Sequence, residues 1–194
     1  MPERAQGRPG VAFTERAGGP GPSTKVVNVV VAGLGGQGVI KASDILADVA
    51  FRAGLDVKKA EVHGMSQRGG SVTSDVRFGA KVLSPMIPEG EADYLLVLSP
   101  SEVESTRALL GRDGVLIPPD LVDEAALPNR RSLNVALLGA LSRHLDLPVA
   151  FWEEAIRAAL PERLHAVNET AFRLGRESGA GRREDGGAGA PAKG

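Results

Sequence analysis

The sequence predicts a three-layer α/β sandwich, in which helices cover a mixed, mainly parallel sheet that carries an antiparallel hairpin. Two apolar runs, residues 26–31 and 94–98, each pass directly into a helical pattern, as a parallel strand passes into its crossover helix. Residues 71–78 alternate between apolar and polar side chains, which is typical of a strand with one solvated face. The order of these elements predicts a sheet of about five to seven strands.

The first strand and helix have the clearest pattern. The strand is a run of β-branched residues, as expected for a central strand covered on both faces, and it ends at Gly33. In residues 37–53 apolar side chains recur at intervals of three and four, with Lys41 and Asp44 on the polar side. Gly54 follows at the position where a helix commonly ends in a left-handed residue. These residues therefore predict one complete strand–helix unit.

The middle of the chain predicts the hairpin. A second strand is expected at residues 56–62, and a glycine-rich segment follows at residues 63–70. After the alternating strand at residues 71–78, residues 79–80 are Gly-Ala and could form a two-residue turn. We therefore expect residues 81–83 to pair with the alternating strand.

The C-terminal half predicts a second strand–helix unit and then mainly helices. At the start of the unit's helix, Ser99 can cap, Pro100 can occupy the first position and Glu102 can reach back to the cap. Further elements are a short strand at residues 114–117 and helices at residues 133–145, 151–160 and 161–175.

Composition excludes several classes of function. The formal net charge of -1 gives no reason to expect a nucleic acid or an anionic membrane as a partner. The chain has no cysteine, and therefore no thiolate ligand for an iron–sulfur cluster. No apolar run approaches the ~20 residues that span a bilayer, and the N-terminus lacks the apolar core of a signal peptide, so we expect a cytoplasmic protein.

The two ends of the chain differ in composition from the rest. Residues 1–24 and 176–194 are rich in Gly, Pro, Arg and Ala and have no periodic apolar positions. Such segments cannot bury enough apolar surface to order themselves, so we expect two disordered tails. Residues 25–175 then form a single domain, for which a hydrophobic content of 42 % is sufficient.

The glycine-rich turn after the first strand is the first candidate site. Its sequence, Gly33-Leu34-Gly35-Gly36-Gln37-Gly38, has G-x-G-x-x-G spacing and makes the predicted sandwich Rossmann-like. Glycine there lets backbone N–H groups approach a diphosphate at the helix N-terminus, or serves only to pack the helix closely on the sheet. For bound NAD the acid on the ribose would be Glu61, but His63-Gly64 follows it in place of an ordinary turn.

The second candidate site is the segment EVHGMSQRGGS at residues 61–71, which is dense in hydrogen-bond donors. It could bind an anion, dock against a partner, or be a solvated connection. In a doubly wound sheet the connections that follow the first and second strands leave the same edge, so we expect the two glycine-rich segments to be neighbours.

Histidine chemistry has few candidates, because the chain contains only three histidines. His144 and His165 lie on predicted helices without the spacing of a metal site, and His63 has no catalytic Ser-His-Asp order around it. A role for His63 as a general base is therefore the alternative to a structural or docking role.

Together these segments resemble the gamma-type domain of the 2-oxoacid:acceptor oxidoreductases, in particular the beta subunits of indolepyruvate ferredoxin oxidoreductases. The resemblance begins with GLGGQG between strand and helix and continues through EVHGMSQRGGSV and VRFG. It extends through SPMIPEGEADYLL at residues 84–96 and ends with NETAFRLG at residues 168–175.

The resemblance implies one subunit of an enzyme that converts a 2-oxo acid and coenzyme A to an acyl-CoA and carbon dioxide while reducing ferredoxin. It places thiamine diphosphate, Mg²⁺ and the iron–sulfur clusters on a larger partner subunit, without which this chain would be inactive. The lack of cysteine agrees with this division, and so does Asp113-Gly114, which lacks the flanking Gly and Asn of a thiamine diphosphate motif.

If the resemblance holds, the two glycine-rich segments face the partner subunit or its substrates. Arg68 is the expected anion contact, because its guanidinium can bind a carboxylate or phosphate through two hydrogen bonds. A self-sufficient NAD(P)-dependent oxidoreductase and a non-catalytic dinucleotide-binding or assembly module remain the alternatives. The expected ligand- or partner-binding residues are Gly33, Gly35, Gly36, Gln37, Gly38, His63, Ser66, Gln67, Arg68, Gly69, Gly70 and Ser71.

Overall fold

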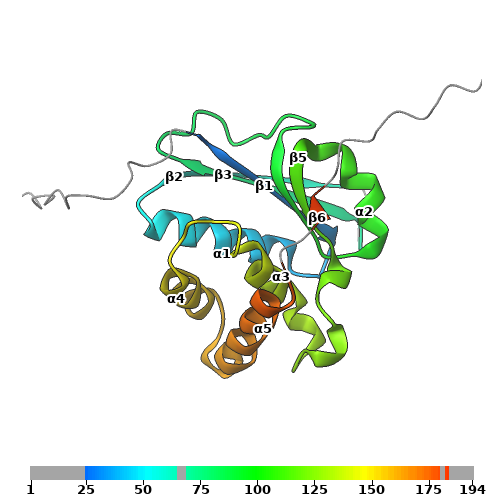
Figure 1. Cartoon of the computed structure of the whole chain (residues 1–194), viewed down its shortest axis with the longest axis vertical. Helices are drawn as coiled ribbons and strands as arrows, with labels where there is room; N and C mark the ends of the chain where they lie inside the picture. Colours follow the sequence, from blue (N-terminus) through cyan, green and yellow to red (C-terminus); the bar gives the residue numbers. More distant parts are fainter. Residues whose placement is uncertain (1–24, 65–68, 180–181, 184–194) are drawn as a thin grey trace, which may run out of the picture.

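A six-stranded mixed sheet organises the protein, for which the computed structural model describes residues 25–64, 69–179 and 182–183 (Figure 1). The strands lie in the order β2-β3-β1-β4-β5-β6. Their bounds are β1 Val27–Leu34, β2 Asp56–His63, β3 Ser71–Gly79, β4 Ala92–Val97, β5 Leu110–Ile117 and β6 Arg182–Arg183.

Parallel pairing is confined to the centre of the sheet, where β1 pairs with β4 and β4 with β5. Both flanks are antiparallel: β3 pairs with β1 and with β2, and β6 pairs with β5. The sheet is mixed, as expected, but the share of antiparallel pairing is larger than the sequence predicted. The cause is β3, which turns back from β2 and inserts between β2 and β1.

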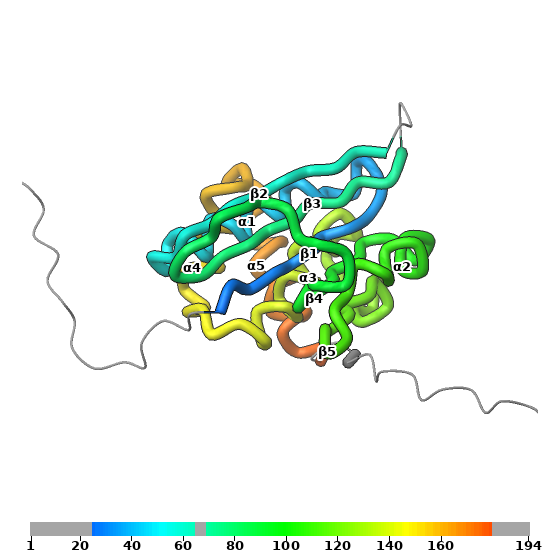
Figure 2. Tube along the Cα trace, turned by 90° about the horizontal axis from the view of Figure 1, so that it is seen from above, coloured from blue at the N-terminus to red at the C-terminus, as the bar shows by residue number. Residues whose placement is uncertain are grey.

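Helices cover the two faces of the sheet unequally, as Figures 1 and 2 show. One face carries α1 (Val39–Arg52), α3 (Leu133–Leu141), α4 (Val149–Ala159) and α5 (His165–Glu177), which share the larger apolar cluster with the sheet. The smaller cluster of the other face includes Ile87 and packs against Val103 of α2 (Pro100–Thr106). The three layers are therefore present, with α2 and residues 80–91 forming the thinner one.

Alternate residues of β1 supply the two clusters. Val29 and Val31 belong to the larger cluster, whereas Val30 and Ala32 belong to the smaller one. All four side chains are buried, since successive side chains of a strand point to opposite faces and both faces of β1 are covered. This confirms the prediction of a central strand.

The first strand–helix unit ends as the sequence predicts. Gly54 has a left-handed φ of 80°, its N–H donates to the carbonyl of Phe51, and the N–H of Leu55 donates to that of Ala50. These two bonds are the Schellman arrangement, which satisfies carbonyl groups at the end of α1.

Two local predictions are wrong. Residues 81–83 form no strand, because β3 finds its partners in β1 and β2; the hairpin is β2–β3, and residues 64–70 connect its strands. Ser99 is the N-cap residue of α2 and Pro100 its first residue, but the Ser99 side chain makes no cap. Its hydroxyl lies 2.9 Å from that of Ser101 instead.

The predicted N-terminal tail, residues 1–24, lies outside the described residues, as does most of the C-terminal one. Within the predicted C-terminal tail, α5 continues to Glu177 and β6 adds a short antiparallel strand beside β5. Among the described residues, no helix has the length and apolar character that crossing a membrane requires.

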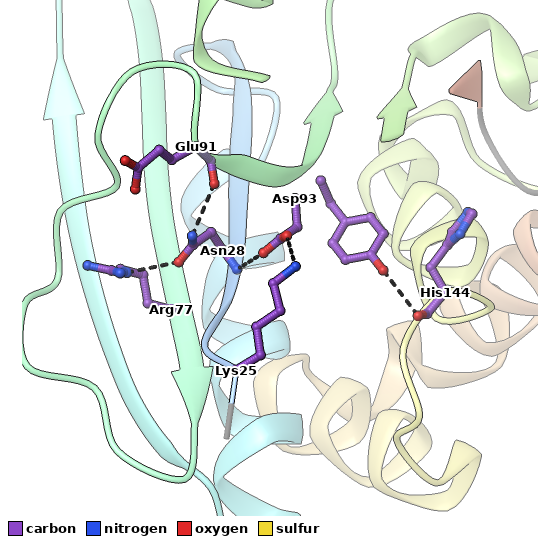
Figure 3. A network of polar contacts seen from close by, with 7 residues as sticks. Lys25, Asn28, Arg77, Glu91, Asp93 and His144 are labelled. Carbon is purple, nitrogen blue, oxygen red and sulfur yellow. Dashed lines mark hydrogen bonds and ion pairs between the residues drawn. The ribbon is translucent and has the colours of Figure 1, made fainter. Parts of the chain in front are cut away.

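A polar network fixes the N-terminal end of β1 against its neighbours (Figure 3). The amide of Asn28 donates to the carbonyl of Glu91 and accepts from the guanidinium of Arg77 on β3. The carboxylate of Asp93 on β4 accepts from the backbone N–H of Asn28 and from the ammonium of Lys25. These contacts fix the sheet at the N-terminal end of β1. The candidate site lies at the opposite end of this strand.

Candidate functional site

The two glycine-rich segments meet at the C-terminal end of β1. Leu34 pairs with Ser71 across β1 and β3, and the N–H of Gly35 donates to the carbonyl of Gly70 over 2.9 Å. The N–H of Gly64 donates to the carbonyl of Ser71 over 2.8 Å, which closes the base of the β2–β3 connection. The segments are therefore neighbours, as predicted, but a hairpin rather than a strand-to-helix connection brings them together.

Gln37 closes the turn between β1 and α1. Its side-chain oxygen accepts from the N–H of Leu34 over 2.7 Å, and its own N–H donates to the carbonyl of Leu34 over 3.1 Å. A Cβ added at Gly33 would lie 2.9 Å from that same side-chain oxygen, so Gly33 makes room for Gln37. Within the predicted site, Gly33 and Gln37 thus shape the turn.

Gly36 and Gly38 give the turn its path, with φ values of 93° and 86°. Gly38 is the N-cap residue of α1; it offers no capping side chain, and the first turn of the helix carries no acid. The N–H groups of that turn carry the positive end of the helix dipole, so they favour a negatively charged group nearby.

Asn134, in the first turn of α3, is a site residue that the sequence did not reveal. Its amide donates to the carbonyl of Gly38 over 3.2 Å and its oxygen accepts from the N–H of Val135 over 2.9 Å. The side chain is only 7 % exposed, and a Cβ at Gly38 would lie 2.5 Å from its nitrogen. Any side chain at Gly38 would therefore collide with the Asn134 amide in its present position.

Beside this contact lies a cavity of about 610 Å³, which we call the cationic cavity. Three basic side chains and one acidic side chain, that of Glu124, line it. Within the described residues, the three basic side chains make no hydrogen bond or ion pair, which suits them to an anionic ligand. The lining residues are Gly36, Gln37, Gly38, Lys41, Leu98, Pro100, Glu124, Arg130, Arg131, Leu133 and Asn134.

A second cavity, of about 450 Å³, lies on the other side of the glycine turn and is called the His63 cavity. It shares Gly36, Gly38 and Lys41 with the cationic cavity, so the two cavities are adjacent at the turn. Its lining is more apolar, with His63 and Asp44 among the polar members. The lining residues are Leu34, Gly35, Gly36, Gly38, Val39, Ile40, Lys41, Asp44, His63 and Val72.

A chain of alternating charges leads to the His63 cavity. The ammonium of Lys59 lies 2.5 Å from Asp44 on α1 and 2.7 Å from Glu61, whose other oxygen lies 3.5 Å from Nε2 of His63. Partial burial alone would lower the pKa of Lys59, but its bonds to the two carboxylates outweigh burial and raise that pKa. The hydrogen bond from Lys59 in turn holds the pKa of Glu61 below its ordinary value.

The other histidines have structural surroundings. Nε2 of His165 lies 2.8 Å from the carbonyl of Leu160, and the ring of His144 packs 5.5 Å from that of Tyr94. Among the described residues no group of three or more His, Cys, Asp or Glu side chains could hold a metal ion.

The structure gathers most of the predicted site. Described residues from both segments lie around the glycine turn, from Gly33 to Gly38 and from Gly69 to Ser71, and His63 lines a cavity there. Ser66, Gln67 and Arg68 lie outside the described residues. The sequence missed the cationic cavity, for which the pair Arg130-Arg131 before a predicted helix was the available signal.

Three comparisons relate this chain to known proteins. A family model described as pyruvate ferredoxin/flavodoxin oxidoreductase matches residues 28–128. The indolepyruvate oxidoreductase subunit IorB of Thermococcus kodakarensis is 35 % identical over 191 residues, an alignment that covers 78 % of this chain and 95 % of the relative.

Solved structures of two oxidoreductases share the fold. The gamma subunit of a keto/oxoacid ferredoxin oxidoreductase from Geobacter sulfurreducens has a TM-score of 0.67 at 24 % identity, over 78 % of this chain and 97 % of that one. A 2-oxoglutarate:ferredoxin oxidoreductase from Magnetococcus marinus, with 2-oxoglutarate, coenzyme A and succinyl-CoA bound, has a TM-score of 0.70 at 20 % identity. That match covers 79 % of this chain and 31 % of the larger one.

Proposed function

This chain belongs to the pyruvate ferredoxin/flavodoxin oxidoreductase family, and from that premise we propose that it is the small subunit of an indolepyruvate-type 2-oxoacid:ferredoxin oxidoreductase. The complex would convert an aryl 2-oxo acid and coenzyme A to an acyl-CoA and carbon dioxide, with reduction of ferredoxin. The observation that supports this most is the meeting of the two glycine-rich segments beside a cation-lined cavity, at one edge of the sheet.

We assign the redox and thiamine chemistry to a larger partner subunit. The chain has no cysteine to hold an iron–sulfur cluster. Its Asp113-Gly114 pair lies inside β5 rather than in a loop at a strand end, so it does not fit a site for thiamine diphosphate and Mg²⁺. This chain would then bind and position, and would have no 2-oxoacid oxidation of its own.

The cationic cavity suits the phosphate groups of coenzyme A. Lys41, Arg130 and Arg131 can neutralise phosphates, since guanidinium groups fork onto phosphate oxygens and an ammonium group acts as a point charge. The relative from Magnetococcus marinus has coenzyme A bound, which makes this ligand the first to test.

Replacing both Arg130 and Arg131 by Ala tests the assignment. Removing two phosphate contacts should raise the KM for coenzyme A at least tenfold, since each charge-assisted contact contributes about 1.5–3 kcal/mol, while the KM for the 2-oxo acid stays unchanged. Arg112→Ala is the control, because Arg112 is exposed on β5 outside both cavities. Wild-type kinetics for coenzyme A in the double variant would remove this cavity from the proposal.

Arg68 tests whether the EVHGMSQRGGS segment contacts the partner. Weaker association of Arg68→Ala with the large subunit in gel filtration would indicate docking, and intact association with a raised KM would indicate ligand contact. A variant indistinguishable from Arg112→Ala in both measurements would leave that arginine without a functional role.

A free dinucleotide is the competing ligand, favoured by the G-x-G-x-x-G spacing. In a dinucleotide-binding sheet the strand with the acidic residue neighbours the strand before the glycine turn. Here β3 lies between β1 and β2, so Glu61 is one strand further away, and it is engaged by Lys59. A rise in melting temperature of the isolated chain with NADH alone would favour the NAD(P)-dependent or dinucleotide-binding alternatives.

A further inference from the structure

His63 lies where the glycine turn, α1 and the hairpin converge. It is the last residue of β2, its cross-strand partner on β3 is Val72, and both line the His63 cavity with Gly35 and Gly36. The side chain is 60 % exposed, so its ring is accessible from the cavity.

The carboxylate of Glu61 gives the imidazole a preferred tautomer. Because Nε2 faces Glu61 at 3.5 Å, a proton on Nε2 is favoured, and the lone pair then resides on Nδ1. Glu61 is itself held by Lys59, which Asp44 holds from α1. A carboxylate that orients an imidazole in this way favours proton abstraction by the ring.

We propose that His63 is the general base that deprotonates the thiol of the acyl acceptor, an inference that rests on the proposed function. A free thiol has a pKa of about 8.5, so only a few per cent is thiolate at neutral pH, and the thiolate is the nucleophile. An imidazole nitrogen beside the thiol supplies the missing proton acceptor.

The step balances within the proposed reaction. The S–H bond of the acceptor breaks and its proton passes to Nδ1 of His63. The sulfur electron pair then forms the C–S bond to the acyl carbon, while the bond from that carbon to its carrier on the large subunit breaks and leaves its electron pair with the carrier. The two electrons of the oxidation leave to ferredoxin. His63 afterwards returns its proton to solvent, to which the ring is exposed.

The other charged groups of the cavity are poorly suited to this step. Asp44 is paired with Lys59, and a carboxylate is too weak a base for a thiol. Lys41, also on α1, is assigned to the phosphates in the cationic cavity, which it lines as well. From its own strand His63 faces Glu61 and Lys59, while β3 contributes the apolar Val72.

The test is His63→Gln in the assembled complex with the large subunit. General base catalysis is worth roughly 10²–10⁴-fold, so we expect kcat/KM for coenzyme A to fall at least 100-fold at pH 7. Release of carbon dioxide from a carboxyl-labelled 2-oxo acid, in a single turnover without coenzyme A, should keep its wild-type rate because no thiol takes part.

The pH dependence separates a base from a structural residue. Above the thiol pKa of about 8.5 the acceptor is already ionised, so the defect of His63→Gln should shrink at least tenfold between pH 7 and pH 9. Glu61→Gln, which removes the orienting carboxylate, should show a smaller defect with the same pH trend. Val62→Gln is the matched control, since Val62 lies between them and points to the opposite face of the strand.

Wild-type kcat/KM for coenzyme A in His63→Gln overturns the inference, as does a loss that is equal at every pH and equal in the release of carbon dioxide. If the wild-type complex itself has no 2-oxoacid oxidation, the proposed function fails instead.

Discussion

Gly38 is the residue on which the geometry of the site depends most. Any side chain there would meet two obstacles, a left-handed φ of 86° and the Asn134 nitrogen at 2.5 Å. Gly36 has a similar φ, but nothing lies within 4 Å of its missing Cβ. Comparing substitutions at the two glycines therefore distinguishes the cost of backbone strain from the cost of steric conflict.

Gly38→Ala should lower the free energy of unfolding by about 2–4 kcal/mol, from backbone strain of about 1–3 kcal/mol together with the displaced amide. Gly36→Ala should carry the strain alone and lose less. Urea unfolding of both variants measures the difference. Equal losses would show that Asn134 yields freely and does not fix the turn.

Asp75 is a buried charge that lowers stability at neutral pH. Its side chain is 8 % exposed and accepts a bond from the N–H of Ile87 over 2.9 Å. Burial raises the pKa of Asp75 above its ordinary value, while the Ile87 bond and the charge of Arg77 partly oppose it. The folded state then binds the proton more tightly than the unfolded one, so this destabilisation is present above the raised pKa and disappears as pH falls towards the ordinary value.

Asp75→Asn should therefore be at least as stable as the wild type at pH 7, because the amide oxygen can still accept from Ile87 without a charge. This advantage should shrink as pH falls towards the ordinary pKa of an aspartate, about 3.9, because the folded wild type then takes up the proton that relieves the cost of the buried charge. Asp75→Ala should lose about 1–3 kcal/mol, because the Ile87 N–H is left without its acceptor. Urea unfolding at several pH values tests both variants. If the Asn variant is less stable than the wild type at pH 7, the charge of Asp75 does not lower stability.

Among the elements, α3 and α5 make the closest approach. A Cβ on Gly175 of α5 would lie 1.7 Å from the carbonyl oxygen of Ala136, and one on Gly139 of α3 would lie 2.1 Å from that of Phe172. The two helices can cross this closely only because neither glycine has a side chain. Since α3 also supplies Asn134, the crossing positions the glycine turn.

Gly175→Ala should lower the free energy of unfolding by about 3 kcal/mol, because overpacking of a fixed backbone forces the helices apart. The displacement of α3 should also weaken binding of coenzyme A by the complex. Arg173→Ala, on the exposed side of the same helix, is the control. A thermal unfolding midpoint equal to that of the control would mean that the crossing adapts without loss.

The sequence predicted elements where one pattern decides the outcome. β1 and α1 follow from an unbroken valine run and a clean amphipathic period, and Gly54 marks the end of the helix. The predicted hairpin with residues 81–83 was wrong. Gly79-Ala80 has the composition of a tight turn, but β3 pairs with β2 and β1, and that choice depends on packing that no local pattern shows. The spacing of its glycines likewise revealed the turn between β1 and α1. The cationic cavity was missed because it joins Lys41 to residues about ninety positions away, and the pair Arg130-Arg131 alone does not show that they meet.

At the scale of the whole molecule, the two ends of the sheet serve different purposes. The Asn28 and Asp93 network fixes one end (Figure 3), and the other end carries the two cavities beside the glycine-rich turn. An exposed end of the sheet with two cavities suits a subunit that completes a site on a larger partner. We expect the large subunit to cover this end.

Viologen reduction by an aryl 2-oxo acid in the presence of coenzyme A tests this account most directly, measured with the chain alone, the large subunit alone and the two together. We predict turnover only from the mixture, because one chain lacks cluster ligands and the other lacks the edge that binds the acyl acceptor. Turnover by this chain alone, or by the large subunit at the rate of the mixture, would contradict it.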